Sequence, residues 1–194
     1  MNVWADLSNF GLDISDSVCR EAVQTVVETL PEGALLQIRA HDSGRMEGIL
    51  RIRLALAAEG AAVMPTLPAN LRRSDVDLHW LIDAGVSMLL VKGASLEPSH
   101  LARRWGEATD LAFLRFALEL HKAGAEFAIG THDAVLREAV LGSASDVPLQ
   151  VLLGVRGQDA RHLARAGRSV RVYVPYGSDW FRYWLRRLAA ARRP

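Results

Sequence analysis

The chain has 194 residues, half of them hydrophobic, with a formal net charge of +1 and one cysteine, Cys19. This length and apolar content predict a single soluble domain, residues 1–194, with a sizeable core. So small a net charge does not favour nucleic acid as a partner, and no apolar run approaches the ~20 residues of a membrane span. One cysteine excludes an internal disulfide, and the first residues do not resemble a signal peptide. We therefore expect a cytoplasmic protein.

The hydrophobic pattern alternates between strands and helices along the whole chain. The expected strands are residues 2–7, 35–40, 61–66, 86–91, 126–130, 149–154 and 170–177. The expected helices are residues 15–30, 46–59 and 74–85, one marked by Leu111, Leu114 and Leu118, one over 133–142, one ending at Gly167 and one beginning at Ser178 or Asp179. The third strand is expected to end at Pro65 and Pro68, because proline suits a strand end better than a strand interior. Residues 98–107 fit either a loop or a short helix.

Seven strand–helix units of this kind predict an α/β fold with a parallel sheet and helices outside it. A doubly wound sheet is one alternative, but no Gly-rich phosphate turn follows the first strand. A TIM-type (β/α) barrel fits better, although a complete barrel has ~250 residues. The chain is therefore expected to fall about one unit short.

The last expected unit carries the most distinctive pattern. A strand that stops at Pro175 and Gly177 is followed by a helix with Tyr183, Arg186 and Arg187 on one face. Two adjacent guanidiniums beside a tyrosine form a fork suited to a carboxylate or phosphate. On spacing alone, a solvated arginine-rich helix remains the alternative.

The run Arg-Val-Tyr-Val-Pro-Tyr-Gly, with Asp-Trp and Tyr-Trp-Leu-Arg-Arg-Leu after it, resembles the last βα unit of the flavin-dependent proline dehydrogenases. That family is a (β/α)8 barrel that oxidises L-proline to pyrroline-5-carboxylate on FAD. The resemblance covers nearly every unit of the chain and implies that the first unit of the family's barrel is missing. It implies substrate binding by Arg186, Arg187, Tyr183 and Leu152, a catalytic place for Tyr173, and FAD binding by Lys92, Gly93, Ala94, Thr131 and His132.

The chain departs from the family at several of these positions. Asp6 aligns with an active-site lysine and Arg39 with an active-site aspartate, so the two signs are exchanged. We count both as catalytic candidates and predict that they form an ion pair, because a paired reversal keeps the attraction. Pro68 and Leu89 replace a glutamine and an arginine that contact the flavin, and Ala190 replaces a glutamate that reaches the substrate amine. We therefore expect FAD to be held weakly or to be lost.

Two function classes follow from the resemblance. One is a proline dehydrogenase-like enzyme that acts on proline or a related cyclic amino acid. The other is a degenerate, non-catalytic barrel that binds a small carboxylate or serves as a structural or interaction module. Two His-Asp pairs, at 41–42 and 132–133, also suggest a metal hydrolase, but no His-X-His lies on a strand, so we assign no metal. The sequence leaves three ways for the barrel to close: on itself, by pairing with another copy, or by taking its first unit from a partner chain.

Overall fold

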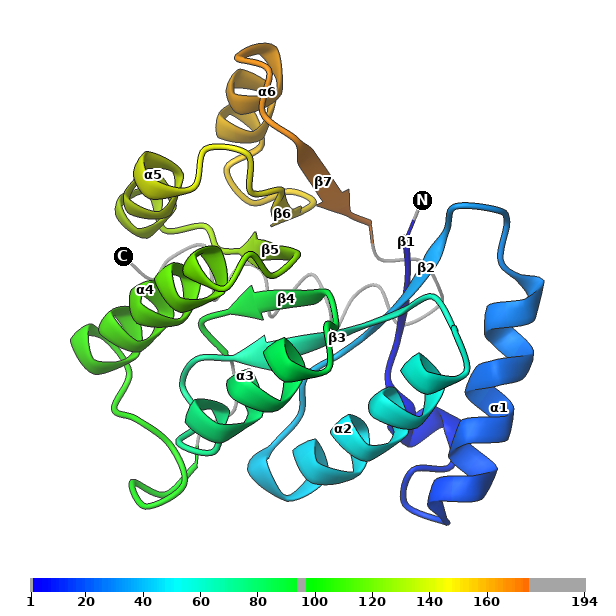
Figure 1. Cartoon of the computed structure of the whole chain (residues 1–194). Helices are drawn as coiled ribbons and strands as arrows, with labels where there is room; N and C mark the ends of the chain where they lie inside the picture. Colours follow the sequence, from blue (N-terminus) through cyan, green and yellow to red (C-terminus); the bar gives the residue numbers. More distant parts are fainter. Residues whose placement is uncertain (1, 94–96, 175–194) are drawn as a thin grey trace. The chain divides into compact units, whose positions relative to one another are not determined.

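The computed structural model describes residues 2–93 and 97–174 (Figure 1). The chain divides into two compact units, unit 1 up to Phe127 and unit 2 from Ala128 onward. Each unit is an alternation of strands and helices, as the sequence predicts. The prediction of a single domain stays a prediction.

Unit 1 contains four parallel strands that are neighbours in the sheet in the order of the sequence. Its elements are β1 (Asn2–Ala5), the 3-10 helix η1 (Leu7–Phe10), α1 (Asp16–Thr29), β2 (Leu35–Ile38), α2 (Ser43–Ala58), β3 (Val63–Pro68), α3 (Ser74–Asp83), β4 (Met88–Val91) and α4 (Glu107–Lys122). In Figure 1 the helices of this unit lie along one side of its strands. Most of these elements end within one to three residues of the predicted bounds.

Strand register determines which side chains share a face of the unit 1 sheet. Trp4 on β1 lies opposite Gln37 on β2, which in turn lies opposite Met64 on β3. Because side chains alternate along a strand, Arg39 lies on the same face as Gln37, two residues further on, and Leu36 and Ile38 lie on the other. Gln37 and Arg39 therefore share their face with Trp4 and Met64.

Strand β3 ends at Pro68, as expected, but Pro65 lies inside the strand and not at its end. Residues 63–65 pair with β2, whereas residues 66–68 pair with β4. Each proline is therefore the last residue of one stretch of pairing. Proline donates no ladder hydrogen bond. Strand β3 tolerates two prolines because β2 and β4 pair with different halves of it, so each proline ends one ladder and interrupts neither.

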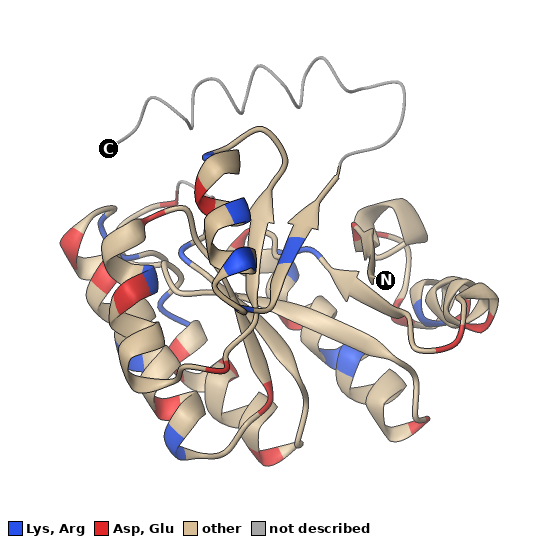
Figure 2. Ribbon diagram, turned by 90° about the horizontal axis from the view of Figure 1, so that it is seen from above, with Lys and Arg blue, Asp and Glu red and all other residues tan. Residues whose placement is uncertain are grey.

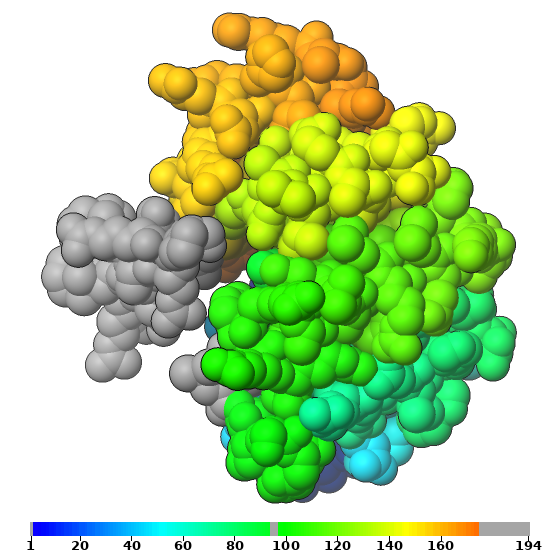
Figure 3. Space-filling model, turned by 90° about the vertical axis from the view of Figure 1, so that its left-hand side faces the viewer, coloured from blue at the N-terminus to red at the C-terminus, as the bar shows by residue number. Residues whose placement is uncertain are grey.

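Helix α4 is confirmed, but its buried face is not the one that the leucines mark. Leu111 and Leu118 are 61% and 41% exposed, whereas Phe113 and Phe116 are buried. Helix α4 lies at the surface in the space-filling view (green, Figure 3). Residues 98–107 form turns and no helix before α4 begins at Glu107, which settles the open alternative in favour of a loop.

Unit 2 continues the same alternation with parallel strands in sequence order. Its elements are β5 (Phe127–Gly130), which begins at the boundary, α5 (Ala134–Ser143), β6 (Leu149–Leu152), α6 (Gly157–Arg165) and β7 (Val170–Tyr173). Leu152 on β6 lies opposite Tyr173 on β7, so these two candidate residues share a face. Figure 2 shows lysine, arginine, aspartate and glutamate interspersed over the helices and loops. Of the helices in the described ranges, none is both long and apolar enough to cross a bilayer.

Candidate functional site

Three candidate positions of unit 1 follow directly after parallel strands. Asp6 comes after β1, Arg39 after β2, and Lys92 after β4. The carboxyl ends of parallel strands lie at the same edge of a sheet, which is where α/β barrels carry their active sites. The strand order of unit 1 thus brings these side chains to one rim.

Asp6 takes part in several hydrogen bonds. Its Oδ1 accepts from the Ser8 backbone N–H at 3.1 Å and from the Ser8 hydroxyl at 2.6 Å, and His41 Nε2 lies 2.6 Å away. Burial alone would raise the pKa of Asp6, but the hydrogen bonds from Ser8 and His41 outweigh it, so the pKa is lowered. Asp6 is thus held as a carboxylate.

The predicted pairing of Asp6 with Arg39 is confirmed, at the outer limit of an ion pair. Arg39 Nη1 lies 4.0 Å from Asp6 Oδ2, and the Arg39 side chain is 58% exposed. The closer partner is His41, whose side chain is 19% exposed. Sequence reasoning had noted His41 only as part of a metal-type pair, and no metal-binding group of three such residues occurs in the described ranges.

A second polar residue on this face was missed. Gln37 is fully buried, and neither its amide oxygen nor its amide nitrogen has a partner among the described residues. A buried amide without a partner costs free energy of about 1–3 kcal/mol. Since Gln37 shares its face with Arg39, this face offers an unsatisfied donor and acceptor below the rim.

Lys92 and Gly93, which follow β4, contact side chains of α4, the preceding loop and the segment after β3. Lys92 Nζ lies 2.6 Å from Asp110 Oδ1 on α4 and 5.5 Å from the ring centre of Trp105. Gly93 has φ +104°, and a Cβ there would come within 1.8 Å of Asn70 Oδ1. Position 93 therefore requires glycine, both for its backbone conformation and for the close approach of Asn70.

In unit 2 the Thr131-His132 pair follows β5. Thr131 is 7% exposed, and its Oγ1 accepts the Asp133 backbone N–H at 3.1 Å. His132 Nε2 accepts the Leu152 backbone N–H at 3.3 Å, which leaves the ring proton of a neutral His132 on Nδ1. Both contacts orient the side chains that the resemblance assigns to the flavin.

Several predicted site residues lie outside the described residues: Ala94, Tyr183, Arg186, Arg187 and also Ala190. Two departures from the family lie inside them. Leu89 is 1% exposed on β4, and Pro68 ends β3 as a buried residue. Neither side chain supplies a charge or a hydrogen-bond donor.

In each unit some described residues carry groups of a kind that can contact a flavin's polar atoms. Lys92, the Thr131 hydroxyl and His132 are a cation and two donors, which suit phosphate, ribityl and carbonyl oxygens. Gly93 leaves room for backbone to approach a ligand. Leu89 and Pro68 suit only apolar contact with the ring. Lys92 and Gly93 belong to unit 1, and Thr131 and His132 belong to unit 2.

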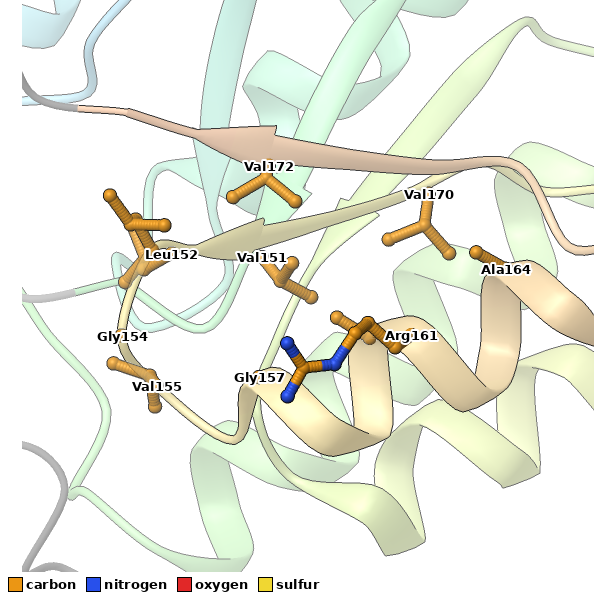
Figure 4. Close-up of a pocket in the computed structure, with 11 residues that line it drawn as sticks. Val151, Leu152, Gly154, Val155, Gly157, Arg161, Ala164, Val170 and Val172 are labelled. Atoms are coloured by element: carbon orange, nitrogen blue, oxygen red, sulfur yellow. The ribbon is translucent and has the colours of Figure 1, made fainter.

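The cavity found in unit 2 is lined in part by Leu152, a predicted substrate-binding residue, and neither Thr131 nor His132 is among its lining residues. It measures about 280 Å³ and lies between α6 and the β6–β7 pair, as Figure 4 shows. Val151, Val170 and Val172 line it, and Arg161 alone is charged among the described residues around it. Its apolar lining makes it a poor match for an amino-acid substrate.

Comparison with solved structures identifies the class of the fold. A proline utilization A (PutA) structure with proline bound in remote sites superimposes with a TM-score of 0.85 at 19% identity, covering 98% of this chain and 24% of that one. PutA from Bdellovibrio bacteriovorus, inactivated by N-propargylglycine, gives a TM-score of 0.81 at 16% identity, covering 96% and 24%. The chain thus has the α/β barrel fold of TIM type that the sequence predicts.

Sequence comparison then identifies the relatives. Proline dehydrogenase 1 of Bacillus subtilis is 30% identical over 191 residues, covering 94% of this chain and 63% of that protein. The proline dehydrogenase of Deinococcus radiodurans is 32% identical over 170 residues, covering 83% and 55%. No family model matches the chain. The chain is a homologue of the proline dehydrogenases, and it spans less than two thirds of the length of these relatives.

Proposed function

We propose that the chain is a proline dehydrogenase-like flavoenzyme that oxidises L-proline, or a related cyclic amino acid, to pyrroline-5-carboxylate. The observation that carries the proposal is homology to proline dehydrogenases over 94% of the chain. The polar residues that follow β1, β2 and β4 in unit 1 and β5 in unit 2 support it, because in each unit they follow strand ends, where barrel enzymes act.

Each residue of the proposed site has a part in binding or orientation. Arg186, Arg187 and Tyr183 would hold the substrate carboxylate through charged hydrogen bonds. Leu152 would pack against the apolar ring of the substrate, with Tyr173 on the same face of the sheet. Asp6 and Arg39 stand at the rim of unit 1 with opposite charges that partly offset each other.

Lys92, Gly93, Ala94, Thr131 and His132 would hold FAD, which when bound accepts the two electrons of the oxidation. The protein then has to bind proline, exclude water and orient its ring. Buried Leu89 and Pro68 give the ring apolar surroundings in place of charge. A cation near the flavin would stabilise its reduced form, and neither Leu89 nor Pro68 supplies one. We therefore expect slow turnover and weak FAD binding.

The visible spectrum of the purified protein tests the proposal. Protein supplemented with FAD and freed of oxygen should lose its flavin absorbance when L-proline is added. Loss of absorbance supports the enzyme. If proline binds but the absorbance persists, the chain is the non-catalytic carboxylate binder.

Substitution of the arginine pair tests the substrate end. Arg186→Lys and Arg187→Lys should each weaken binding of a cyclic amino-acid carboxylate by about 1.5–3 kcal/mol, because lysine does not reproduce the planar fork. Calorimetric titration measures the loss. Arg104→Lys is a control outside the proposed site. Absence of binding to the unsubstituted protein at millimolar ligand contradicts the proposal.

A further inference from the structure

The cavity of unit 2 is an apolar space that the proposed function leaves unused. It lies between α6 and the β6–β7 pair (Figure 4). Val151 on β6 lies opposite Val172 on β7, and Val170 is on the same face two residues earlier, so both strands present valines to it. Ala160 and Ala164 line it from α6, one helical turn apart. The alanines are too small to fill the space between helix and strands, and this leaves the cavity.

The size of the cavity limits the kind of molecule that it can hold. Pockets for drug-sized ligands measure about 300–1,000 Å³, and this cavity measures about 280 Å³. At about 30 Å³ for each heavy atom, the share of one water molecule in the liquid, it holds about nine heavy atoms. Val172 is 47% exposed, so the cavity opens onto the surface. Its walls and volume therefore suit one short apolar chain.

Arg161 gives the cavity a positive charge at its edge. In Figure 4 its side chain extends from α6 toward Gly157, the first residue of the helix, where the positive end of the helix dipole adds to the charge. Within the described ranges Arg161 has no ion-pair partner, because Asp159 on the same helix lies 4.0 Å from Arg137 on α5. Residues 149–174 contain five arginines and one aspartate, so the surroundings favour an anion over a cation.

We propose that this cavity binds a medium-chain alkyl carboxylate, with its chain against the valines and alanines and its carboxylate on Arg161. A guanidinium binds a carboxylate through two parallel N–H···O hydrogen bonds. One unit charge on each partner balances, whereas a phosphate monoester brings nearly two negative charges to one arginine. The site goes beyond the proposed function, because it uses neither flavin nor amino acid.

The alternative is a packing gap, or a groove that a protein segment covers. An alkyl carboxylate site gains affinity with each methylene that leaves water, and it loses affinity when the cation is removed. A packing gap shows neither dependence. The two explanations therefore differ in their response to the length and to the charge of a small ligand.

The experiment is calorimetric titration of the full chain with sodium butanoate, hexanoate and octanoate, and with 1-octanol, at neutral pH, where carboxylates are ionised. The variants are Arg161→Gln, which removes the cation, and Ala164→Phe, which fills the cavity. The matched controls are Arg165→Gln and Ala166→Phe, at exposed positions that do not line the cavity. The Tm of every variant reports whether the fold is intact.

Wild type and both controls should bind octanoate at one site, about tenfold more tightly than hexanoate and more tightly than 1-octanol. Arg161→Gln should weaken octanoate binding about tenfold and change 1-octanol binding by less than about twofold. Ala164→Phe should abolish binding of both, with a Tm within about 5 °C of wild type.

Three results overturn the site. One is equal binding of octanoate by wild type and Arg161→Gln, and another is the absence of any gain from hexanoate to octanoate. The third is octanoate binding that persists in a folded Ala164→Phe variant. If Ala164→Phe does not fold, the chain-length series and Arg161→Gln decide. If octanoate does not bind wild type, the cavity is a packing gap or a protein groove and the proposal fails, whereas the proposed function is unaffected.

Discussion

At the scale of single residues, Asp6 concentrates the electrostatics of the rim. Its pKa is lowered from the ordinary 3.8, because hydrogen bonds from Ser8 and His41 outweigh the effect of burial. A carboxyl whose pKa is lower in the folded state stabilises the fold above the unfolded pKa, and the contribution is lost as the pH falls through the folded value. Stability from Asp6 is therefore complete at pH 7 and begins to be lost only as the pH falls below the ordinary pKa of 3.8 towards the lower folded value.

Substituting Asp6→Asn should lower the free energy of unfolding at pH 7 by about 1 kcal/mol, since a charged hydrogen-bond acceptor becomes neutral. The difference from wild type should shrink as the pH falls below 3.8. Urea unfolding at a series of pH values measures it. Asp83→Asn, at an exposed position on α3, should show no such trend. A difference that stays constant to pH 3 contradicts this account.

Gly93 is constrained twice, by its φ of +104° and by Asn70. Gly93→Ala should lower the free energy of unfolding by at least about 2 kcal/mol, because strain at positive φ adds to a steric overlap. Gly124→Ala separates the two causes: its φ is +66°, but nothing lies within 4 Å of the added Cβ. Gly124→Ala should lower the free energy of unfolding by about 1–2 kcal/mol. Adding Asn70→Ala should restore part of the stability lost in Gly93→Ala and none of that lost in Gly124→Ala. Equal costs at both glycines would show that Asn70 moves aside freely.

At the scale of elements, α4 shows how tertiary packing selects a face. Apolar residues surround much of this helix, so the leucine spacing alone does not determine which face packs on the sheet. Phe113 and Phe116 are buried, whereas Leu111 and Leu118 are exposed. Large aromatic side chains bury more apolar area, and this favours the phenylalanine face.

Phe113→Ala should therefore lower the free energy of unfolding by about 3–5 kcal/mol, the usual cost of a cavity left by an aromatic side chain. Leu111→Ala, one position on the exposed face, should change it by less than about 0.5 kcal/mol. Denaturant unfolding of both variants measures the contrast. Comparable losses would mean that the leucine face is also covered.

At the scale of the whole molecule, the open matter is whether the fold holds FAD. Ligand that binds only the folded state stabilises it, by about 2.7 kcal/mol at a concentration of 100 times Kd. For a chain of this size that corresponds to a rise in Tm of about 5–10 °C. Thermal unfolding with increasing FAD measures it.

Riboflavin, which lacks the phosphates, serves as a matched control, because the retained donors suit the phosphate and ribityl end. We expect a smaller rise with riboflavin than with FAD. Lys92→Ala should reduce the FAD rise, whereas Lys122→Ala, at the end of α4, should not. No rise with millimolar FAD would contradict a flavin site.

Much of the fold follows from local sequence alone. Ser15 and Asp133 stand at the first positions of two predicted helices and cap α1 and α5. The Ser15 hydroxyl accepts the Val18 N–H, and Asp133 accepts the Val135 and Leu136 N–H groups. Caps, glycine stops and apolar periods are short-range signals, so strand–helix order and the barrel class can be read without a structure. The C-terminal motif likewise led to the proline dehydrogenase homologues.

Tertiary structure decided what depends on distant neighbours. Asp6 takes His41, 35 positions away, as its close partner and keeps Arg39 only at 4.0 Å. Gln37 is buried between β1 and β3 with no hydrogen-bond partner in the part of the chain that the structure describes. Strand β3 holds two prolines because its two neighbours pair with different halves of it. Local propensity is set by a residue's own chemistry, whereas pairing, burial and register arise only when strands far apart in sequence are brought side by side.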